Sequence, residues 1–272
     1  MTGIHGRLTW AGMCGRIALY TEPERLSRVF DAALAAGVSP GDLPRFNVGP
    51  TTEIFGIIEA GDPPDTAGSR GRILDRFRWG LIPSWSKDVS PGGRMFNARA
   101  ESVASTASFR DAFRRRRAVI PADGFFEWHK GPGNGPEVKS QPYFFSRADG
   151  QPLALAGLWE VWRDPLGPDD RSAWITSCAI ITTTAGPDVA SVHERMPVVL
   201  EREAIEAWLD PAEDVEVLEA LMQPAPAGTL AHHPVDRRVG NVANDEPGLL
   251  APVDVDEEDV VPLPVSAPTL FD

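Results

Sequence analysis

Residues 118–128, AVIPADGFFEW, form an apolar stretch in which one carboxylate, Glu127, stands between Phe126 and Trp128. The aromatic and β-branched residues of this stretch predict a strand. Because side chains alternate along a strand, Glu127 faces either solvent or the interior. In the interior, desolvation would raise the pKa of Glu127 and suit it to proton transfer.

Further strands on both sides of this stretch predict a mainly antiparallel sheet with flanking helices, an α+β fold. The strands are predicted over residues 16–20, 53–59, 73–79, 143–146, 153–162 and 173–184. Helices are predicted from a capping-box pattern at 21–24 to Gly37, through Phe109 and Phe113, and over 203–209 and 215–222. The first helix would bury Leu26, Val29, Phe30, Ala33 and Leu34. Residues 60–71 are predicted as a surface loop and 131–136 as a turn.

Length and composition indicate a single large domain that needs no disulfide framework. The chain has 272 residues, is 42% hydrophobic, and contains no apolar run long enough to cross a bilayer. Only Cys14 and Cys178 are present, which fits a reducing cytoplasm, and Cys178 lies in an apolar run typical of a buried structural thiol. The pair His232-His233 lacks partners at metal-ligand spacing, so neither a metal nor a cofactor is expected.

Charge is distributed unevenly along a chain whose net charge is −13. The last 33 residues, 240–272, hold eight acidic residues and no Lys or Arg, and 251–272 is predicted to be a disordered acidic tail. Residues 94–130 instead hold eight basic and four acidic side chains. Within that segment, Arg114 to Arg117 form either a solvated helix end or a phosphate contact.

The tetrapeptide MCGR, residues 13–16, offers an unusual nucleophile if Cys14 becomes the first residue. An N-terminal cysteine carries an amine and a thiol on one carbon skeleton. Its α-amine titrates near pH 7.7 to 8.0, far below lysine, so it can form a Schiff base with an aldehyde at neutral pH. The thiol can then close a thiazolidine ring. The alternative is that Met13-Cys14 is an ordinary dipeptide inside a strand.

Two other segments also allow both a structural and a functional interpretation. Trp79 and Trp85 flank a proline turn and form either a core corner or a platform on which nucleobases stack. His193 and Arg195 lie two residues apart in a turn that enters an apolar run. A histidine in such a place is either a polar surface residue or an acid/base group.

Seven motifs together resemble the SRAP family, the SOS response-associated peptidases, whose members crosslink to abasic sites in single-stranded DNA. The motifs are MCGR (13–16), RFNVGP (45–50), WGLIPSW (79–85), NARAES (97–102), AVIPADGFFEW (118–128), HERMPVVL (193–200) and VGNVAN (239–244). They occur in the family's order from Cys14 to Asn244. The resemblance implies one domain over 13–250, with a sheet or barrel core.

The resemblance also implies roles for individual residues. Cys14 would be exposed by self-processing at the Met13-Cys14 bond and would form the crosslink, with Schiff-base chemistry that can also cleave the strand as a lyase. Asn97 would hold the sugar or the aminothiol, and Glu127 and His193 would be the acid/base pair. The residues implied to contact DNA are Arg16, Arg99, Arg195, Trp79 and Trp85. The expected protein is a cytoplasmic monomer that associates with the nucleoid when bound to DNA.

Two other functions remain open at this point. Cys14 and His193 could be the nucleophile and base of a cysteine peptidase acting in trans. Alternatively, the chain could be a non-covalent single-stranded DNA-binding module. Residues 1–12 are interpreted as a leader or a misassigned start, and this matters because an amide at Cys14 cannot form the thiazolidine.

Overall fold

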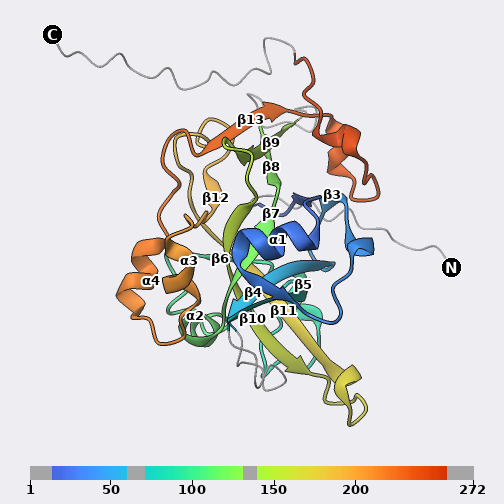
Figure 1. The fold of residues 1–272 in the computed structure, drawn as a ribbon, viewed down its shortest axis with the longest axis vertical. Helices are drawn as coiled ribbons and strands as arrows, with labels where there is room; N and C mark the ends of the chain where they lie inside the picture. The colour runs from blue at the N-terminus through green and yellow to red at the C-terminus, as the bar shows by residue number, and fades with distance from the viewer. Residues whose placement is uncertain (1–13, 60–70, 131–139, 256–272) are drawn as a thin grey trace.

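The computed structural model describes residues 14–59, 71–130 and 140–255 (Figure 1). Several predicted segments lie outside these ranges, namely the leader at 1–12, Met13, most of the loop at 60–71, the turn at 131–136 and the tail from 256 onward. The described strands are β1 (Ile17–Leu19), β2 (Ala32–Leu34), β3 (Arg45–Val48), β4 (Glu53–Glu59), β5 (Arg72–Trp79), β6 (Asn97–Arg99), β7 (Arg117–Ala122), β8 (Gly124–His129), β9 (Gln141–Arg147), β10 (Leu153–Arg163), β11 (Trp174–Thr184), β12 (Arg195–Pro197) and β13 (Leu230–Pro234). The described α-helices are α1 (Pro23–Phe30), α2 (Arg110–Arg115), α3 (Ala204–Leu209) and α4 (Val215–Leu221).

The strands form two sheets, one of which closes on itself. The first has the order β13-β9-β8-β1-β3, and the second has the order β12-β11-β10-β7-β4-β5-β2, with β6 also paired to β11. An additional pairing of β11 with β5 closes β11, β10, β7, β4 and β5 into a barrel. Most pairings are antiparallel, and the parallel ones involve β5 or β11. The α+β prediction with an antiparallel, barrel-like core is therefore confirmed.

The prediction of one continuous strand over 118–128 is wrong, because the chain changes sheets at Asp123. β7 belongs to the barrel and β8 to the other sheet. The Asp123 carboxylate accepts hydrogen bonds from the backbone N–H groups of Tyr20 and Thr21 at 2.5 and 2.7 Å, and from the Thr21 hydroxyl at 2.5 Å. These bonds fix the crossing point. The next residue, Gly124, has no room for a Cβ, which would lie 2.4 Å from the Phe145 carbonyl oxygen.

Apolar side chains fill both sides of each sheet. The barrel interior is continuous with one face of the five-stranded sheet, through residues such as Phe77, Ile120, Ile180 and Phe125. The helices cover the outside of the barrel, where Phe30, Phe113 and Trp208 are buried, and Figure 1 shows α2, α3 and α4 gathered on one side. The other face of the five-stranded sheet packs against the C-terminal segment that contains Val239 and Leu249.

The first helix is much shorter than predicted. α1 ends at Phe30, and Asp31 takes a left-handed conformation with a φ of 50°. The chain then forms β2, which pairs in parallel with β5, so Ala33 and Leu34 are exposed rather than buried on a helix. Pairing with β5 satisfies backbone groups that a longer helix would have bonded internally. The expected capping box is absent because the Thr21 hydroxyl binds Asp123.

The remaining predicted elements lie close to where the sequence placed them, and the folded part extends slightly past residue 250. Pro252 bridges to Val235, and the Val253 N–H donates to the Pro234 carbonyl oxygen at 3.0 Å. Within the described ranges, no helix is long and apolar enough to span a membrane.

Candidate active site

Glu127 points into the protein rather than into solvent. Alternation along β8 places Phe126 on the outer face and Phe125 and Glu127 on the face shared with the barrel core. Glu127 is 3% exposed, and its Oε1 atom has no hydrogen-bond partner. Burial raises its pKa to about 8, against a smaller lowering by the backbone N–H of Trp128. The carboxyl group is therefore poised for proton transfer near neutral pH.

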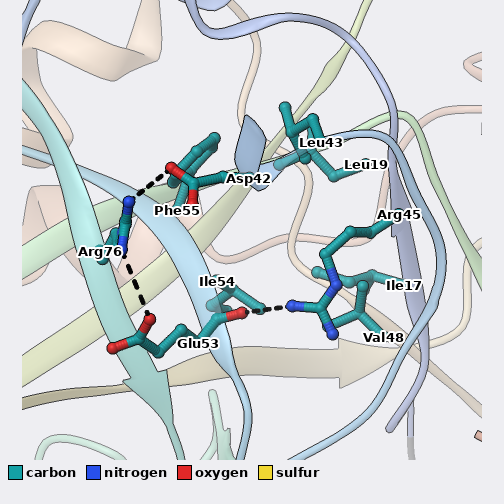
Figure 2. A pocket seen from close by; sticks show the side chains of 10 residues that line it. All are labelled: Ile17, Leu19, Asp42, Leu43, Arg45, Val48, Glu53, Ile54, Phe55 and Arg76. Carbon is teal, nitrogen blue, oxygen red and sulfur yellow. Dashed lines mark hydrogen bonds and ion pairs between the residues drawn. The ribbon is translucent and has the colours of Figure 1, made fainter. Parts of the chain in front are cut away.

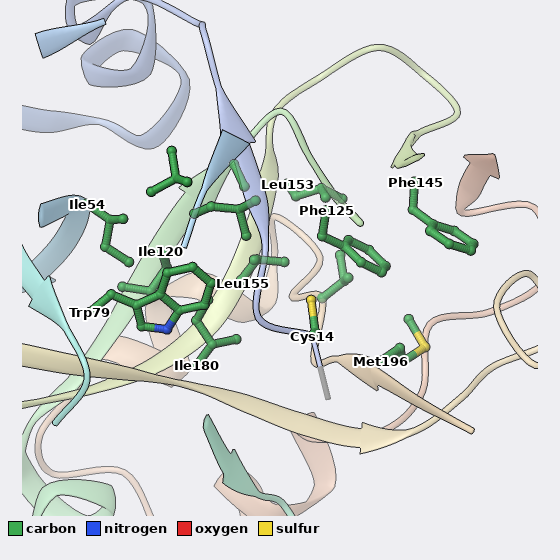
Figure 3. Close-up of a cluster of buried hydrophobic side chains, with 14 of the residues drawn as sticks. Cys14, Ile54, Trp79, Ile120, Phe125, Phe145, Leu153, Leu155, Ile180 and Met196 are labelled. Atoms are coloured by element: carbon green, nitrogen blue, oxygen red, sulfur yellow. The ribbon is translucent and has the colours of Figure 1, made fainter. Parts of the chain in front are cut away.

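Cys14 lies three residues before the start of β1 and is 0% exposed. In Figure 3 its side chain points into the apolar cluster, toward Phe125. Burial raises the pKa of the Cys14 thiol well above its ordinary value, and the Glu127 carboxylate raises it further, whereas the backbone N–H of Arg16 lowers it. The Cys14 thiol is therefore protonated at neutral pH.

Asn97 connects the Cys14 segment to the barrel. β6 pairs in parallel with β11 and brings the Asn97 side chain, which is 7% exposed, to the Cys14 backbone. Its Nδ2 atom donates to the Cys14 carbonyl oxygen at 2.7 Å, but its Oδ1 atom has no partner. Asn97 Oδ1 and Glu127 Oε1 are thus two buried acceptors without a donor, both on residues that interact with Cys14. Buried polar atoms without partners are rare and call for a functional explanation.

His193 completes this group from the turn before β12. Its Nδ1 atom lies 3.9 Å from Glu127 Oε1. The same nitrogen lies 3.1 Å from the Arg195 backbone nitrogen and 3.2 Å from the Arg195 carbonyl oxygen. Neutral His193 can accept from the N–H group, and protonated His193 can donate to the carbonyl oxygen. The turn can therefore satisfy either charge state, which suits an acid/base residue.

The comparison with known proteins now identifies the family, because residues 13–242 match the SOS response associated peptidases (SRAP). The chain belongs to the SRAP family. It is 35% identical over 240 residues to abasic site processing protein YoqW of Bacillus subtilis (strain 168), covering 88% of this chain and 99% of that relative. It is also 34% identical to abasic site processing protein HMCES of Gallus gallus, covering 78% of this chain and 67% of the relative.

Two further similarities cover most of this SRAP chain. Abasic site processing protein YedK of Escherichia coli (strain K12) is 32% identical over 247 residues, covering 89% of this chain and all of YedK. An X-ray structure of a protein from Bacteroides thetaiotaomicron superposes with a TM-score of 0.73 at 21% identity, covering 88% of this chain and 100% of that one. The second similarity shows that the fold is shared.

The predicted phosphate-binding arginines of this SRAP domain differ in their availability. Arg99, at the end of β6, is exposed. Arg195, at the start of β12, binds both carboxylate oxygens of Glu101, and its Nη2 atom donates to the Thr182 carbonyl oxygen at 2.7 Å. Arg99 is thus open to a ligand, whereas Arg195 already holds a carboxylate.

Arg16 does not have the position expected of a DNA contact. It is 9% exposed, and its Nη1 atom donates to Asn47 Oδ1 at 2.7 Å and to the Val239 carbonyl oxygen at 2.5 Å. Its guanidinium lies 5.8 Å from the centre of the Trp128 ring, and burial lowers its pKa to about 10. Arg16 therefore joins the start of the described chain to the C-terminal segment.

That junction contains residues whose importance the sequence did not reveal. The C-terminal latch comprises Arg16, Asn47 and residues 239–245. Asn47 Nδ2 lies 2.7 to 3.1 Å from the carbonyl oxygens of Val239, Asn241 and Asn244. Asp245 Oδ1 accepts from the backbone N–H groups of Phe46 and Asn47. The motifs RFNVGP and VGNVAN are thus in direct contact. Their polar residues could have suggested this contact, but the long separation of the two motifs along the chain gave no sign of it.

The two tryptophans of the WGLIPSW motif have different environments. Trp79 is 0% exposed, and its indole N–H donates to the Phe96 carbonyl oxygen at 2.9 Å, so it is a core residue and presents no face for stacking. Trp85 is 66% exposed and remains a candidate base platform. The prediction for Trp79 fails because the end of β5 lies inside the barrel.

The arginines at 114–117 divide in the same way. Arg114 and Arg115 are exposed, as expected of a solvated helix end. Arg116 forms an ion pair with Glu160 at 2.6 Å. Arg117 is 3% exposed and donates to the carbonyl oxygens of Phe113 and Trp208 at 2.7 and 2.6 Å.

A separate hollow lies between β1, β3, β4 and β5 (Figure 2). Apolar residues such as Ile17 and Phe55 form its walls, and Arg76 pairs with Asp42 at 2.7 Å at its edge. Its lining includes none of the predicted site residues. Within the described ranges, no group of three or more His, Cys, Asp or Glu side chains could hold a metal ion.

Proposed function

We propose that this protein captures abasic sites in single-stranded DNA through a thiazolidine formed by Cys14 as the first residue of the mature chain. The SRAP match and the names of YoqW, HMCES and YedK, each called an abasic site processing protein, support abasic-site processing in the DNA damage response. An abasic deoxyribose in its open form offers an aldehyde, the group with which a 1,2-aminothiol reacts.

The observation that carries this proposal is the pair of unpartnered acceptors beside Cys14. An α-ammonium group offers three N–H donors, whereas the backbone amide of a Cys14 within the chain offers one. Asn97 Oδ1 and Glu127 Oε1 are both buried and both lack a donor. A site left short of donors when Cys14 is an amide would be satisfied by an ammonium group at the same residue.

The pKa of Glu127 suits proton transfer from that ammonium group. With a pKa of about 8, Glu127 is matched to an α-amine, which titrates near 7.7 to 8.0. Transfer between matched groups costs little free energy, so the amine is released as a nucleophile without a large barrier. The positive charge of the ammonium also favours ionised Glu127, which makes the carboxylate available as the base.

The reaction then runs in balanced steps. His193 assists opening of the sugar hemiacetal to the aldehyde. The amine adds to the aldehyde carbon, and loss of one water gives the imine. The thiol sulfur adds to the imine carbon while the thiol proton moves to nitrogen, which closes the thiazolidine. If the ring does not close, the imine can promote strand cleavage, which is the proposed lyase activity.

The thiol environment favours this order of events over peptidase chemistry in trans. A cysteine peptidase needs a thiolate, and its site lowers the thiol pKa. Here burial and Glu127 raise the pKa of the Cys14 thiol. The amine is therefore the better first nucleophile. Self-processing at the Met13-Cys14 bond would expose that amine, and single-stranded DNA, with an accessible sugar and sequence-independent contacts to Arg99 and Trp85, would be the partner.

Intact mass spectrometry of the full chain tests the proposal directly. We expect a mature mass that begins at Cys14. Incubation with single-stranded DNA containing one abasic site should add the mass of the oligonucleotide less one water. Acetylation of the α-amine or the Cys14→Ala substitution should abolish the adduct, whereas Cys178→Ala, which removes the other buried thiol, should retain it. A stable adduct on the acetylated protein would exclude the thiazolidine.

A further inference from the structure

Glu101 is an acidic residue that contacts Arg195, one of the two arginines assigned to phosphate binding, and lies two residues after the other, Arg99. It binds Arg195 through both carboxylate oxygens, with Oε2 accepting from Nη2 at 3.0 Å. The hydrogen bonds from Arg195 hold the pKa of Glu101 below its ordinary value, and the charge of Arg99 lowers it further. Glu101 is therefore ionised at neutral pH and interacts with both cations.

The fold brings these three side chains together at one edge of the barrel. β6 and β12 pair with opposite sides of β11, where Thr182 is opposite Arg99 on one side and Pro197 on the other. The Ala100 N–H donates to the Thr182 carbonyl oxygen at 2.9 Å, and the chain then turns so that the Val103 N–H reaches the Arg99 carbonyl oxygen at 2.9 Å. This turn carries Glu101 to the Arg195 guanidinium.

The ion pair occupies the groups that a phosphate would use. Arginine binds carboxylates and phosphates through the same planar pair of N–H donors. The Arg195 side chain is 13% exposed and the Glu101 side chain 50% exposed, so solvent and ligands reach the pair from the Glu101 side. An ion pair with one half-exposed partner has modest strength and can be exchanged for another anion.

We propose that Glu101 is a competitor for DNA phosphate, occupying Arg195 in the free protein and giving way when a single strand binds. The inference rests on the proposed function, because it needs single-stranded DNA as the ligand. Its consequence is weaker retention of undamaged strands, since every strand must displace Glu101 but only an abasic strand gains the covalent bond to Cys14. Glu101 thereby shortens the time that the site spends on undamaged strands.

The test is the salt dependence of binding to an undamaged single-stranded oligonucleotide. Glu101→Gln keeps the size of the side chain and removes its charge. We expect this variant to bind about twofold to fivefold more tightly at low salt. The plot of log affinity against log salt should be steeper by up to about 0.7, because in the wild type the displaced Glu101 carboxylate takes up a cation that offsets the one released where Arg195 contacts a phosphate.

A matched control is available in the pair formed by Arg147 and Glu201. Their side chains are 18% and 48% exposed, close to the values for Arg195 and Glu101. Glu201→Gln removes the same charge from a different ion pair, so it reports the effect of net charge alone. We expect its salt slope to equal that of the wild type. In an Arg195→Gln background, Glu101→Gln should no longer steepen the slope.

The outcomes separate this inference from the proposed function. If the wild type crosslinks abasic DNA but Glu101→Gln binds undamaged DNA with unchanged or lower affinity, the competitor role is wrong and the crosslinking proposal stands. Lower affinity together with slower crosslinking at saturating DNA would make Glu101 a positioning residue for Arg195. A wild type that neither binds nor crosslinks single-stranded DNA would overturn both.

Discussion

Two buried asparagines serve this fold in different ways. Asn47 is 2% exposed, and its amide is fully used, with Oδ1 accepting from Arg16 and Nδ2 facing three carbonyl oxygens of the C-terminal latch. Asn97 is 7% exposed and uses only half of its amide, because Nδ2 donates to Cys14 while Oδ1 has no partner. The side-chain amide thus has hydrogen-bond partners for all of its polar atoms at Asn47 but lacks one for Oδ1 at Asn97.

The difference separates a structural site from a chemical one. A satisfied buried amide stabilises the folded state, whereas a buried acceptor without a donor costs free energy until a ligand or a new group supplies one. Asn97 Oδ1 carries this cost, and so does Glu127 Oε1, which lies on another strand and also approaches Cys14. Under the proposed function, an α-ammonium group at Cys14 would supply donors to both acceptors.

Of the two asparagines, Asn47 in the latch should have the larger effect on stability when it is replaced. Asn47→Ala removes an acceptor from a buried guanidinium and leaves carbonyl oxygens of the latch without their donor, so it should reduce the free energy of unfolding by about 3 kcal/mol. Urea denaturation measures this loss. Asn241→Ala is the control. The Asn241 side chain is exposed and accepts from the Ala243 N–H, so this substitution should cost under about 1 kcal/mol. If Asn47→Ala lowered the free energy of unfolding by no more than about 1 kcal/mol, as expected of Asn241→Ala, the hydrogen bonds of the Asn47 side chain would contribute little to stability.

Asn97→Ala should change stability little and slow crosslinking strongly. It removes one hydrogen bond to Cys14 but also an unsatisfied acceptor, so the free energy of unfolding should change by about 1 kcal/mol or less. The crosslinking rate at saturating DNA should fall by about 10-fold to 100-fold, which corresponds to about 1.4 to 2.7 kcal/mol in the barrier. A loss of stability as large as that of Asn47→Ala, with an unchanged rate per folded molecule, would reassign Asn97 to the scaffold.

The sequence predicted those elements whose pattern is local. β4 and β10 have the alternation or apolar content of strands over their whole length, and they lie where expected. Residues 118–128 carried the same local signal, yet the chain changes sheets at Asp123 because Tyr20 and Thr21, about a hundred residues earlier, bind its carboxylate. A contact of that separation leaves no periodic trace in the sequence.

In the candidate site too, local motifs were predictable from the sequence and long-range contacts were not. Motif resemblance named Cys14, Asn97, Glu127 and His193, and these residues interact with one another in the fold. It could not distinguish buried Arg16 from exposed Arg99, because both are arginines within short motifs and only the tertiary contacts of Arg16 with Asn47 and Val239 decide its burial.

Glu127 should make the free energy of unfolding depend on pH. Its pKa is about 8 in the folded protein and near 4.5 when unperturbed, so between these values the folded state holds a proton that the unfolded state has released. Stability attributable to Glu127 is therefore present below about pH 4.5 and falls as the pH rises, by at most about 1.4 kcal/mol per pH unit, until about pH 8. Glu127→Gln removes this dependence. In urea denaturation, the free energy of unfolding of the variant should therefore rise relative to that of the wild type as the pH increases from about 4.5 to about 8.

The same measurement distinguishes an amide from an amine at Cys14. A free ammonium group beside Glu127 favours the carboxylate and lowers its pKa, which narrows the window in which the wild type loses stability. As the pH rises, a chain that begins at Cys14 should therefore lose less stability in total than the acetylated chain. In the Glu127→Gln background, the two chains should have the same pH dependence of stability. If stability fell equally with pH in the two chains, the amine would be too far from Glu127 for proton transfer. A charge close enough to exchange a proton must also shift the pKa of its partner.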